Sequence, residues 1–393
     1  MTELQQLINE LCPNGVKFAA LEECCKILDN KRKPVTKAAR QAGEYPYYGA
    51  NGIQDYVSDY IFDGIFVLVG EDGSVVTPSG NPVVNWATGK IWVNNHAHII
   101  EEKDGVLLRY LYHYLQTVNV SALIHGNIPK LTGGDFRAIK VPVPPLPVQS
   151  EIVRILDNFT ELTAELTAEL TAELTARKQQ YAHYRDTLLK LDNNVPSYTL
   201  KDICLSIADG DHMPPPKADS GVPFITISNI TETRQIDFSN VMYVPREYYD
   251  KLADKRKAKR DDILYTVVGS FGIPVHISSK TEFVFQRHIA ILRPNQQMIV
   301  PRYMYHIMQS TEFYKQADKA AKGAAQRTIG LSSLGNMTIP LPSIEEQKRI
   351  VAILDRFDTL CNDISAGLPA EIEARQKQYE YYRDKVLTFE PAK

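Results

Sequence analysis

Between positions 148 and 191 the apolar residues recur at steps of three and four, which is the spacing of one helical face. The stripe consists of Ile152, Ile155, Phe159, Leu162, Leu166, Leu170, Leu174, Tyr181, Tyr184 and Leu188. The proline-rich stretch 142–147 should remain extended, and Pro196 should lie beyond the end of the helix. We therefore predict a helix over 148–191, about 66 Å long if it is unbroken.

The same pattern returns later in the chain at a constant offset of 198 residues. VPVPPLPVQSEIVRILDNF…ARKQQYAHYRDTLL (141–189) aligns without a gap with IPLPSIEEQKRIVAILDRF…ARQKQYEYYRDKVL (339–387), and 22 of the 49 aligned residues are identical. The second copy predicts a helix over 344–387 with a bend at Gly367-Leu368-Pro369. Each stripe alone would be exposed, so we expect the two helices to pair as a coiled coil. The alternative is that each helix packs on its own globular domain.

The remaining segments contain short β-type runs bounded by Gly, Asn, Asp and Pro. The runs are residues 67–69, 90–93, 223–227 and 284–286. Short helices are predicted over 107–116 and 302–309, and their Arg-Tyr-x-Tyr-His segments, at 109–113 and 302–306, resemble each other. The chain thus contains two diverged mixed α and β domains, and a period near 200 residues is too long for a solenoid repeat.

Composition narrows the class of protein. The chain has 44 Lys and Arg against 47 Asp and Glu, so its formal net charge of −3 excludes a uniformly basic nucleic-acid coat but not local basic patches. No apolar run is long enough for a membrane span, and the polar start MTELQQLINE does not resemble a signal peptide, so we expect a cytoplasmic protein without membrane contact. The five scattered cysteines argue against a disulfide framework or a zinc site, and we expect Cys24 and Cys25 to be buried.

Catalytic motifs are scarce. The sequence has no Walker A motif, no dinucleotide-binding glycine pattern, no H-E-x-x-H and no G-x-S-x-G. The nine histidines are scattered, and those beside apolar runs are expected to be structural. We therefore expect the chain to be no enzyme, with no catalytic residues and no metal site of its own.

Basic and amide side chains favour nucleic-acid binding instead. Lys and Arg gather at 31–33 and 251–260, where they suit phosphate contact, although a solvated surface is the alternative. Polar, turn-rich segments lie close to these clusters, and Asn, Gln, Arg and Lys side chains suit base edges in the major groove. The candidate DNA-binding residues are Lys31, Arg32, Lys33, Tyr48, Asn51, Gln54, Asn94, Asn95, His212, Asn229, Lys255, Arg256, Lys257, Lys259, Arg260 and Arg287.

Two diverged domains, each followed by a near-identical helical segment, resemble the specificity (S) subunit of type I restriction–modification enzymes over essentially the whole chain. QSEIVRILDNF with TAELTAELTAEL resembles the central spacer of the IC subfamily, and EEQKRIVAILDRFDTL with EARQKQYEYYRD resembles the distal helical region. EYPYYGANGIQDYVSDYIFDG and VPFITISNI…RDDILYTVVGS…QRHIAIL resemble two types of target recognition domain.

This resemblance implies an α+β fold with an internal, pseudo-twofold repeat. Residues 1–145 and 193–342 would be two mixed α/β target recognition domains, and the helical regions 146–192 and 343–393 would pair as an antiparallel coiled coil. Each domain would read one half of a bipartite, asymmetric site in double-stranded DNA. The helices would dock two modification (M) subunits and, through them, restriction (R) subunits. S-adenosylmethionine, ATP and Mg²⁺ would serve adenine-N6 methylation and DNA cleavage by those partners, and this chain would bind no cofactor.

The TAEL repeats are expected to act as a ruler between the half-sites. The three identical units begin and end at Thr163, Leu166, Thr167, Leu170, Thr171 and Leu174. Four helical residues add a net turn of about 40°, close to the ~34° twist of one base pair, so each unit matches about one base pair of spacer. The alternative for the repeats is an inert surface helix. The alternatives for the whole chain are a stand-alone DNA-binding protein, a coiled-coil adaptor, or a nuclease or methyltransferase.

Overall fold

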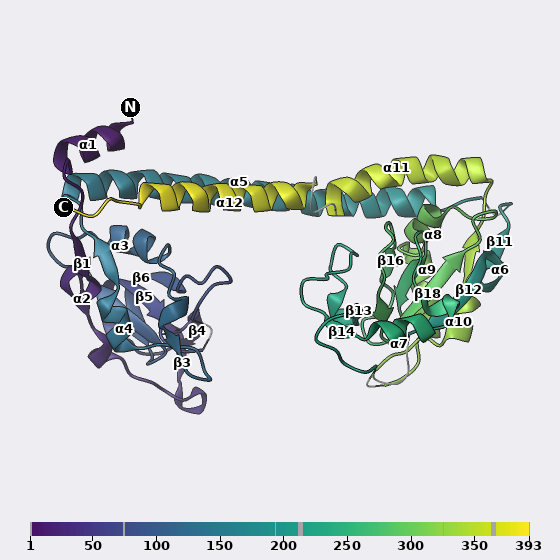
Figure 1. Ribbon diagram of the computed structural model, residues 1–393, viewed down its shortest axis with the longest axis horizontal. Coiled ribbons are helices and arrows are strands. Elements are labelled where there is room, and N and C mark those ends of the chain that lie inside the picture. Colours follow the sequence, from purple (N-terminus) through teal and green to yellow (C-terminus); the bar gives the residue numbers. More distant parts are fainter. Residues whose placement is uncertain are drawn as a thin grey trace. The chain divides into compact units, whose positions relative to one another are not determined.

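The computed structural model of the chain describes residues 2–73, 75–192, 194–210, 215–324, 326–362 and 367–392. It divides into two compact units, which we call unit 1 (residues 1–167 and 374–393) and unit 2 (residues 168–373). Figure 1 labels the helices and strands of both. The boundaries between the units fall inside the long helices. The units therefore do not correspond to the four regions inferred from sequence, and the limits of those regions stay predictions.

The core of unit 1 is a six-stranded sheet of order β2-β7-β5-β6-β3-β4. Its strands are β2 (Lys26–Ile27), β3 (Ala42–Gly49), β4 (Gly52–Val57), β5 (Phe62–Gly70), β6 (Val84–Val93) and β7 (Ala97–Glu101). Neighbouring strands are antiparallel except β3 and β6, which are parallel. Alternate residues of β5 enter two clusters, Val67 and Val69 on one face and Phe66 and Leu68 on the other, so both faces of this sheet are buried.

Smaller elements surround this sheet, and β1 pairs antiparallel with β10. They are α1 (Glu3–Leu11), β1 (Phe18–Ala20), α2 (Leu21–Cys24), η1 (Asp29–Lys31), η2 (Lys37–Ala39), α3 (Leu108–Leu115), η3 (Ser121–Leu123), β8 (Ile124–His125), β9 (Lys130–Leu131), α4 (Gly133–Ala138) and β10 (Lys140–Pro142). The predicted helix at 107–116 is confirmed as α3.

Unit 2 contains a four-stranded antiparallel sheet of order β12-β18-β15-β16 and a three-stranded sheet of order β14-β13-β17. The strands are β11 (Ser197–Thr199), β12 (Cys204–Asp209), β13 (Val222–Ile225), β14 (Met242–Val244), β15 (Ile263–Thr266), β16 (Pro274–His276), β17 (Val284–Phe285), β18 (Ile289–Pro294) and β19 (Thr338–Pro340). The shorter helices are α6 (Leu200–Ile203), η4 (Ile227–Asn229), α7 (Arg246–Lys251), η5 (Asp254–Arg256), α8 (Pro301–Ile307), α9 (Thr311–Ala320) and α10 (Leu331–Gly335).

The two units share a framework and differ in what is inserted into it. The order β2-β7-β5-β6 in unit 1 corresponds to β12-β18-β15-β16 in unit 2, and β11 pairs with β19 as β1 pairs with β10. After the first strand of this framework, unit 1 inserts the hairpin β3-β4, which joins the edge of β6. At the same place unit 2 inserts β13 and β14, which form part of a separate sheet.

The long helices are confirmed with small corrections. The first is α5 (Leu146–Leu188), which is a single helix. Pro147 lies in its first turn, where a backbone N–H has no hydrogen-bond partner within the helix, so a proline loses no bond there. The second repeat forms α11 (Ile344–Asn362) and α12 (Leu368–Val386), so the predicted bend is a break between two helices. None of the described helices is at once long and apolar enough to cross a membrane.

Within unit 1 the helices pair and also pack on the globular part. Val148, Ile152 and Leu156 of α5 are buried in the core of the unit. Further along, the ring of Phe159 lies 6.1 Å from that of Tyr382, and the hydroxyls of Thr160 and Tyr379 are 3.0 Å apart. From the first of these contacts to the second, the residue number rises on α5, from 159 to 160, and falls on α12, from 382 to 379. The two helices therefore run antiparallel.

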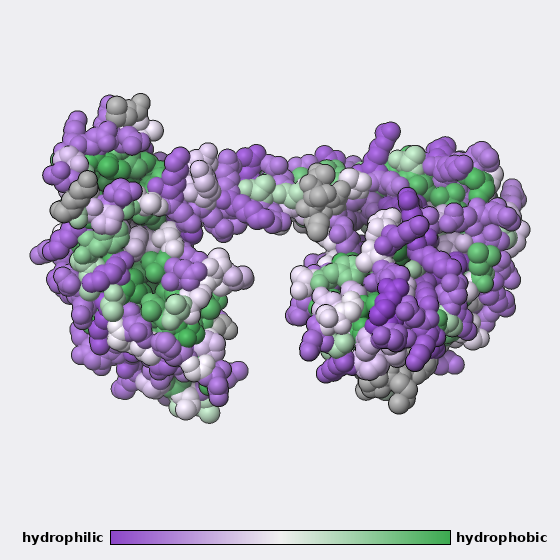
Figure 2. Space-filling model, in the orientation of Figure 1, coloured by the Kyte–Doolittle hydropathy of each residue, from purple (hydrophilic) through white to green (hydrophobic). Residues whose placement is uncertain are grey.

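Unit 2 repeats this arrangement. Ile350 and Leu354 of α11 are buried in its core, and the ring of Phe357 lies 6.4 Å from Tyr181 and 5.4 Å from Tyr184 of α5. The expected α+β fold with paired helices is therefore confirmed. The alternative, packing on the globular domains, also holds for the first turns of α5 and α11. Figure 2 shows both hydrophilic and hydrophobic residues on the visible face of each unit, with hydrophobic residues over the globular part of unit 1, beside α1 and along α11.

Candidate nucleic-acid interface

A buried glutamine ties each long helix to the globular part of its unit. The Gln149 side chain accepts a hydrogen bond from the Leu107 amide (2.9 Å) and donates to the carbonyls of Gly105 (3.0 Å) and Pro144 (2.7 Å). Its counterpart 198 residues later, Gln347, makes the same three bonds in unit 2, at 2.8, 3.1 and 3.0 Å. Both side chains are fully buried, so the repeat preserves the connection as well as the helix.

A second duplicated contact joins an arginine and a histidine of the short helix to an aspartate of the long one. In unit 1, Arg109 Nε and His113 Nε2 both lie 2.8 Å from Asp157 Oδ1. In unit 2, Arg302 Nε and His306 Nε2 lie 3.0 and 2.6 Å from Asp355 Oδ1. This explains the shared Arg-Tyr-x-Tyr-His pattern as a structural feature.

Burial lowers the pKa of both histidines in this contact, His113 and His306. Burial opposes ionisation of Asp355, but hydrogen bonds from His306 and Arg302 hold its pKa below the usual range. A neutral histidine that donates from Nε2 to the carboxylate leaves Nδ1 as an acceptor. Tyr181 occupies that position in unit 2, 2.8 Å from His306 Nδ1. In unit 1 the His113 Nδ1 has no hydrogen-bond partner among the described residues.

Three candidate segments of unit 1 meet at one end of the six-stranded sheet. The Lys33 amide donates to the Val93 carbonyl (3.1 Å), and the Asn94 amide donates to the Tyr48 carbonyl (3.1 Å). The Asn94 side chain reaches Gln54 Oε1 at 3.4 Å. These bonds bring together residues 31–33, the β3–β4 hairpin and the turn before β7. The exposed candidates there are Lys31, Lys33, Asn51, Gln54 and Asn95.

Of the three other candidates in unit 1, Tyr48 and Asn94 are buried and Arg32 is partly buried. Tyr48 is 8% exposed and Asn94 is 2% exposed, and the side-chain Oδ1 of Asn94 accepts a hydrogen bond from the His96 amide. The Arg32 side chain is only 12% exposed: its guanidinium binds Glu71 (2.5 Å) and the carbonyls of Ala97 (2.7 Å) and Asp29 (2.9 Å). Arg32 therefore holds its own loop in place, and its planar guanidinium suits that task.

Two basic residues of unit 2, Arg256 and Arg287, lie beside the equivalent end of its framework sheet, whereas Arg260 lies just before β15, at the opposite end. Arg256 lies 3.4 Å from Asp209, the last residue of β12, and Gly210 donates to the carbonyl of Ile289 at the start of β18. Arg287 is exposed in the turn just before β18, the position that Asn95 holds before β7. The two units thus place polar residues at corresponding strand ends.

Several of the unit 2 candidates make internal contacts. Lys257 Nζ donates to the Asp250 carbonyl at 2.9 Å, and Lys259 pairs with Asp254 at 2.8 Å, whereas Lys255 and Arg260 are exposed. Asn229 is buried, and its side chain bonds to the Thr226 amide and to the carbonyls of Asp237 and Asn240. His212 lies outside the described residues.

Arg293 was not among the candidate residues named from sequence, although it anchors the basic segment of unit 2. Its guanidinium bonds to Asp262 (3.0 Å), Asp254 (2.9 Å) and the Lys257 carbonyl (2.8 Å). The one available signal was an arginine within the apolar strand IAILRP, because a buried arginine needs partners. The described residues contain no group of His, Cys, Asp and Glu that could hold a metal ion.

A duplicated framework that carries two different polar surfaces defines a two-domain recognition protein. The sequence pattern of the type I restriction modification DNA specificity domain matches this chain twice, at residues 13–176 and 193–374. The chain belongs to that family, the specificity subunits of type I restriction–modification systems.

Individual relatives agree with this assignment. The chain is 39% identical to a protein of Haemophilus influenzae described as a type I restriction enzyme specificity subunit, over 95% of this chain and 96% of that one. It is 36% identical to the EcoR124I/EcoR124II specificity subunit of Escherichia coli, over 73% and 72% of the two chains. A solved structure from work on assembly and conformational transition of the type I system shares the fold, with a TM-score of 0.61, 16% identity and coverage of 95% and 98%.

Proposed function

We propose that this chain is the DNA-recognition subunit of a type I restriction–modification complex, and that each unit reads one half of a bipartite, asymmetric site. The observation that carries the proposal is the shared framework sheet with a different insertion in each unit. A common framework places the reading loops in the same way, while different loops recognise different bases. Each unit therefore supplies its own half of the sequence specificity.

The exposed side chains at the two strand ends suit different parts of DNA. Asn51, Gln54 and Asn95 offer amides that pair with adenine edges, and Arg287 offers a guanidinium that pairs with guanine. Lys255 and Arg260 are exposed on the basic segment of unit 2 and would contact phosphates, which contribute affinity independent of sequence. Arg32, Asn94 and Asn229 support these surfaces from within.

We further propose that the paired helices dock two M subunits, and that R subunits join through them. The duplicated glutamine and Arg-His-Asp contacts support two equivalent docking faces, which would bind two copies of one partner. Titrating the chain with M subunit, and measuring the mass of the complex, should give a plateau at two M per chain. A plateau at one would contradict two equivalent faces.

The chemistry is assigned to those partners, which would use S-adenosylmethionine, ATP and Mg²⁺, while this chain binds no cofactor. Incubation of the purified chain with DNA and radiolabelled S-adenosylmethionine should transfer no methyl group until M subunit is added. Transfer by the chain alone would refute a non-catalytic role.

DNA recognition itself is tested by sequencing methylated adenines in a host that expresses the chain with its M subunit. We expect one motif with two defined halves and an undefined spacer. A continuous motif, or no DNA binding in a gel shift with M subunit, would refute the proposal and favour an adaptor.

A further inference from the structure

The backbone of the β3–β4 hairpin in unit 1 gives Gln54 an unusual position. Tyr47 pairs with Asp55 and Tyr48 pairs with Ile53, so Gln54 is the extra residue of a β-bulge. A bulge redirects the side chain of its extra residue, and bulges are frequent beside functional sites. Gln54 is exposed, at the end of the six-stranded sheet that carries the other exposed candidates of unit 1.

The glycine at position 49 makes room for the Gln54 amide group. Gly49 is the last residue of β3, and a Cβ atom there would come within 2.1 Å of Gln54 Nε2 and 2.3 Å of its Cδ. Real Cβ contacts are never so short, so any larger residue at position 49 would displace the amide. The exposed side chain of Gln54 therefore lies in a place that the hairpin provides.

Asn94 determines which way this amide faces. The backbone amide of His96 donates to Asn94 Oδ1 at 2.8 Å, so Asn94 presents its Nδ2 group as the donor. That group donates to Gln54 Oε1 at 3.4 Å. The relay fixes Oε1 on the side of Asn94, and Gln54 Nε2 has no hydrogen-bond partner among the described residues.

The end of the sheet where Gln54 lies also carries unpaired positive charge. Lys31 and Lys33 are exposed, and no ion pair of either is found in the part of the chain that the structure describes. The Lys33 amide donates to the Val93 carbonyl, one residue before Asn94, so this loop lies beside the relay. Such lysines attract phosphate groups, so this end of unit 1 suits a DNA duplex.

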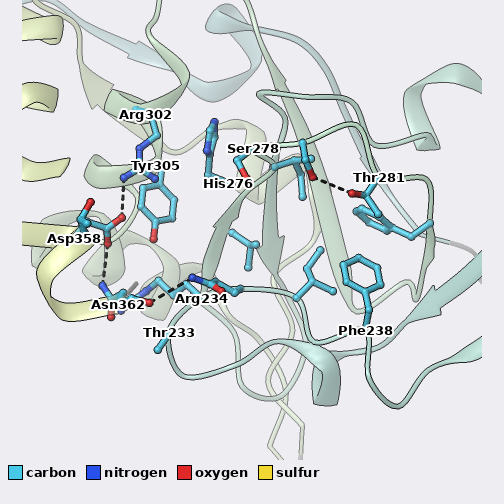
Figure 3. Close-up of a pocket in the computed structure, with 17 residues that line it drawn as sticks. Thr233, Arg234, Phe238, His276, Ser278, Thr281, Arg302, Tyr305, Asp358 and Asn362 are labelled. Carbon is cyan, nitrogen blue, oxygen red and sulfur yellow. Dashed lines mark hydrogen bonds and ion pairs between the residues drawn. The ribbon is translucent and has the colours of Figure 1, made fainter. Parts of the chain in front are cut away.

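A polar pocket of unit 2 offers no comparable group. It has a volume of about 520 Å³ and lies beside β16, at the end of the framework sheet away from Arg287 (Figure 3). Asp358 in its lining accepts hydrogen bonds from Arg302 (2.7 Å) and from the Asn362 side chain (2.9 Å), and Arg302 also bonds to Asp355 (2.6 Å). These charged groups join α8 to α11, whereas the Gln54 amide keeps one polar group for a ligand.

We propose that Gln54 reads one adenine in the half-site of unit 1 and that Asn94 is the residue that positions it. The proposal rests on the DNA-binding function proposed above. Gln54 Oε1 keeps a second lone pair, which would accept from adenine N6, while Nε2 would donate to adenine N7. A reversed amide would set Nε2 against the N6 donor. Because methyltransferases extrude their target base, this A·T pair is a different one from the methylated pair.

The test expresses the full chain with its M subunit and sequences the methylated adenines of the host. One half-site of the wild-type motif should contain an A·T pair that Gln54→Ala no longer requires, while every other position is kept. In binding titrations with duplexes that differ only at this pair, the wild type should favour A·T by roughly 5- to 150-fold, and Gln54→Ala should show no preference. Gly49→Ala should relax the same position, because its methyl group displaces the Gln54 amide. Gln6→Ala, which removes an exposed amide from α1, is the control and should keep the motif.

Asn94→Asp tests the positioning role. The aspartate still accepts from the His96 amide, but it cannot donate to Gln54 Oε1 and would accept from Nε2 instead, which reverses the amide. This variant should relax the same position as Gln54→Ala. In the Gln54→Ala background the change should have no further effect on base preference, because Asn94 acts through Gln54. If Asn94→Asp did not fold, Gly49→Ala alone would decide whether the placement of the amide matters.

Three results would overturn the reading of adenine. They are a relaxed position that is a G·C pair in the wild-type motif, an unchanged motif in Gln54→Ala, or equal weakening of all duplexes, which marks a phosphate contact. A further effect of Asn94→Asp on base preference in the Gln54→Ala background would overturn the positioning role. A wild type without a bipartite motif would refute the proposed function itself, whereas a bipartite motif that none of these variants relaxes would refute only the role of Gln54.

Discussion

Replacing Gln347 by alanine removes three hydrogen bonds from the interior of unit 2. The Val300 amide and the carbonyls of Met298 and Pro342 then lose their partner in a site where Gln347 is fully buried. Leaving a buried polar group unpaired costs about 1–3 kcal/mol. Water can enter the vacated space and reduce this cost, so we expect a loss of about 3 kcal/mol in the local stability of the contact between α8 and α11.

Hydrogen exchange at the start of α8 measures this loss directly, because Gln347 protects the Val300 amide. At about 1.4 kcal/mol per tenfold change, a loss of 3 kcal/mol speeds exchange by about a hundredfold. Gln347→Met fills similar space without the amide and should behave in the same way, which separates lost hydrogen bonds from a cavity. Gln179→Ala, at an exposed position on α5, is the matched control and should change little.

The repeat adds a second readout. Gln149→Ala should speed exchange at the Leu107 amide to a similar extent and leave Val300 unchanged, because the two contacts lie in separate units. Two results would contradict this role of the glutamines. One is that exchange at Val300 becomes less than threefold faster in Gln347→Ala. The other is that either variant speeds exchange equally at both amides.

Three further predictions concern DNA. Neutralising Lys255, Arg256 and Lys257 together should weaken binding to all sequences about equally in anisotropy titrations, and an effect on one half-site alone would mark them as base readers. Replacing residues 1–140 by another recognition domain of this type should change one half of the methylated motif; changes in both halves would disprove independent reading. Deleting Thr171–Leu174 shortens the continuous helix α5 by one repeat and should shorten the motif spacer by about one base pair. An unchanged spacer would refute the ruler.

Periodic features were predictable from sequence because their signal is local. The steps of three and four in the first repeat predicted α5, and Gly367-Leu368-Pro369 predicted a bend where the structure has a break before α12. Cys24 and Cys25 are buried as expected, at 1% and 3% exposure. The sequence did not show that Val148, Ile152 and Leu156 pack in the globular core rather than against the partner helix. One apolar stripe on α5 makes both kinds of contact, so its spacing cannot distinguish them.

The sequence by itself determined that the chain is a duplication with two long helices and two diverged recognition domains, since repeat identity and apolar periodicity are read directly from the order of the residues. Only the tertiary structure decided which polar side chains are available to a ligand. Arg32 is committed to Glu71, 39 residues away, and Arg293 to Asp262, 31 residues away, whereas Gln54 is exposed and its Nε2 has no hydrogen-bond partner among the described residues. A basic cluster in sequence shows charge, but partners distant in the chain determine whether that charge is neutralised, because folding brings them together.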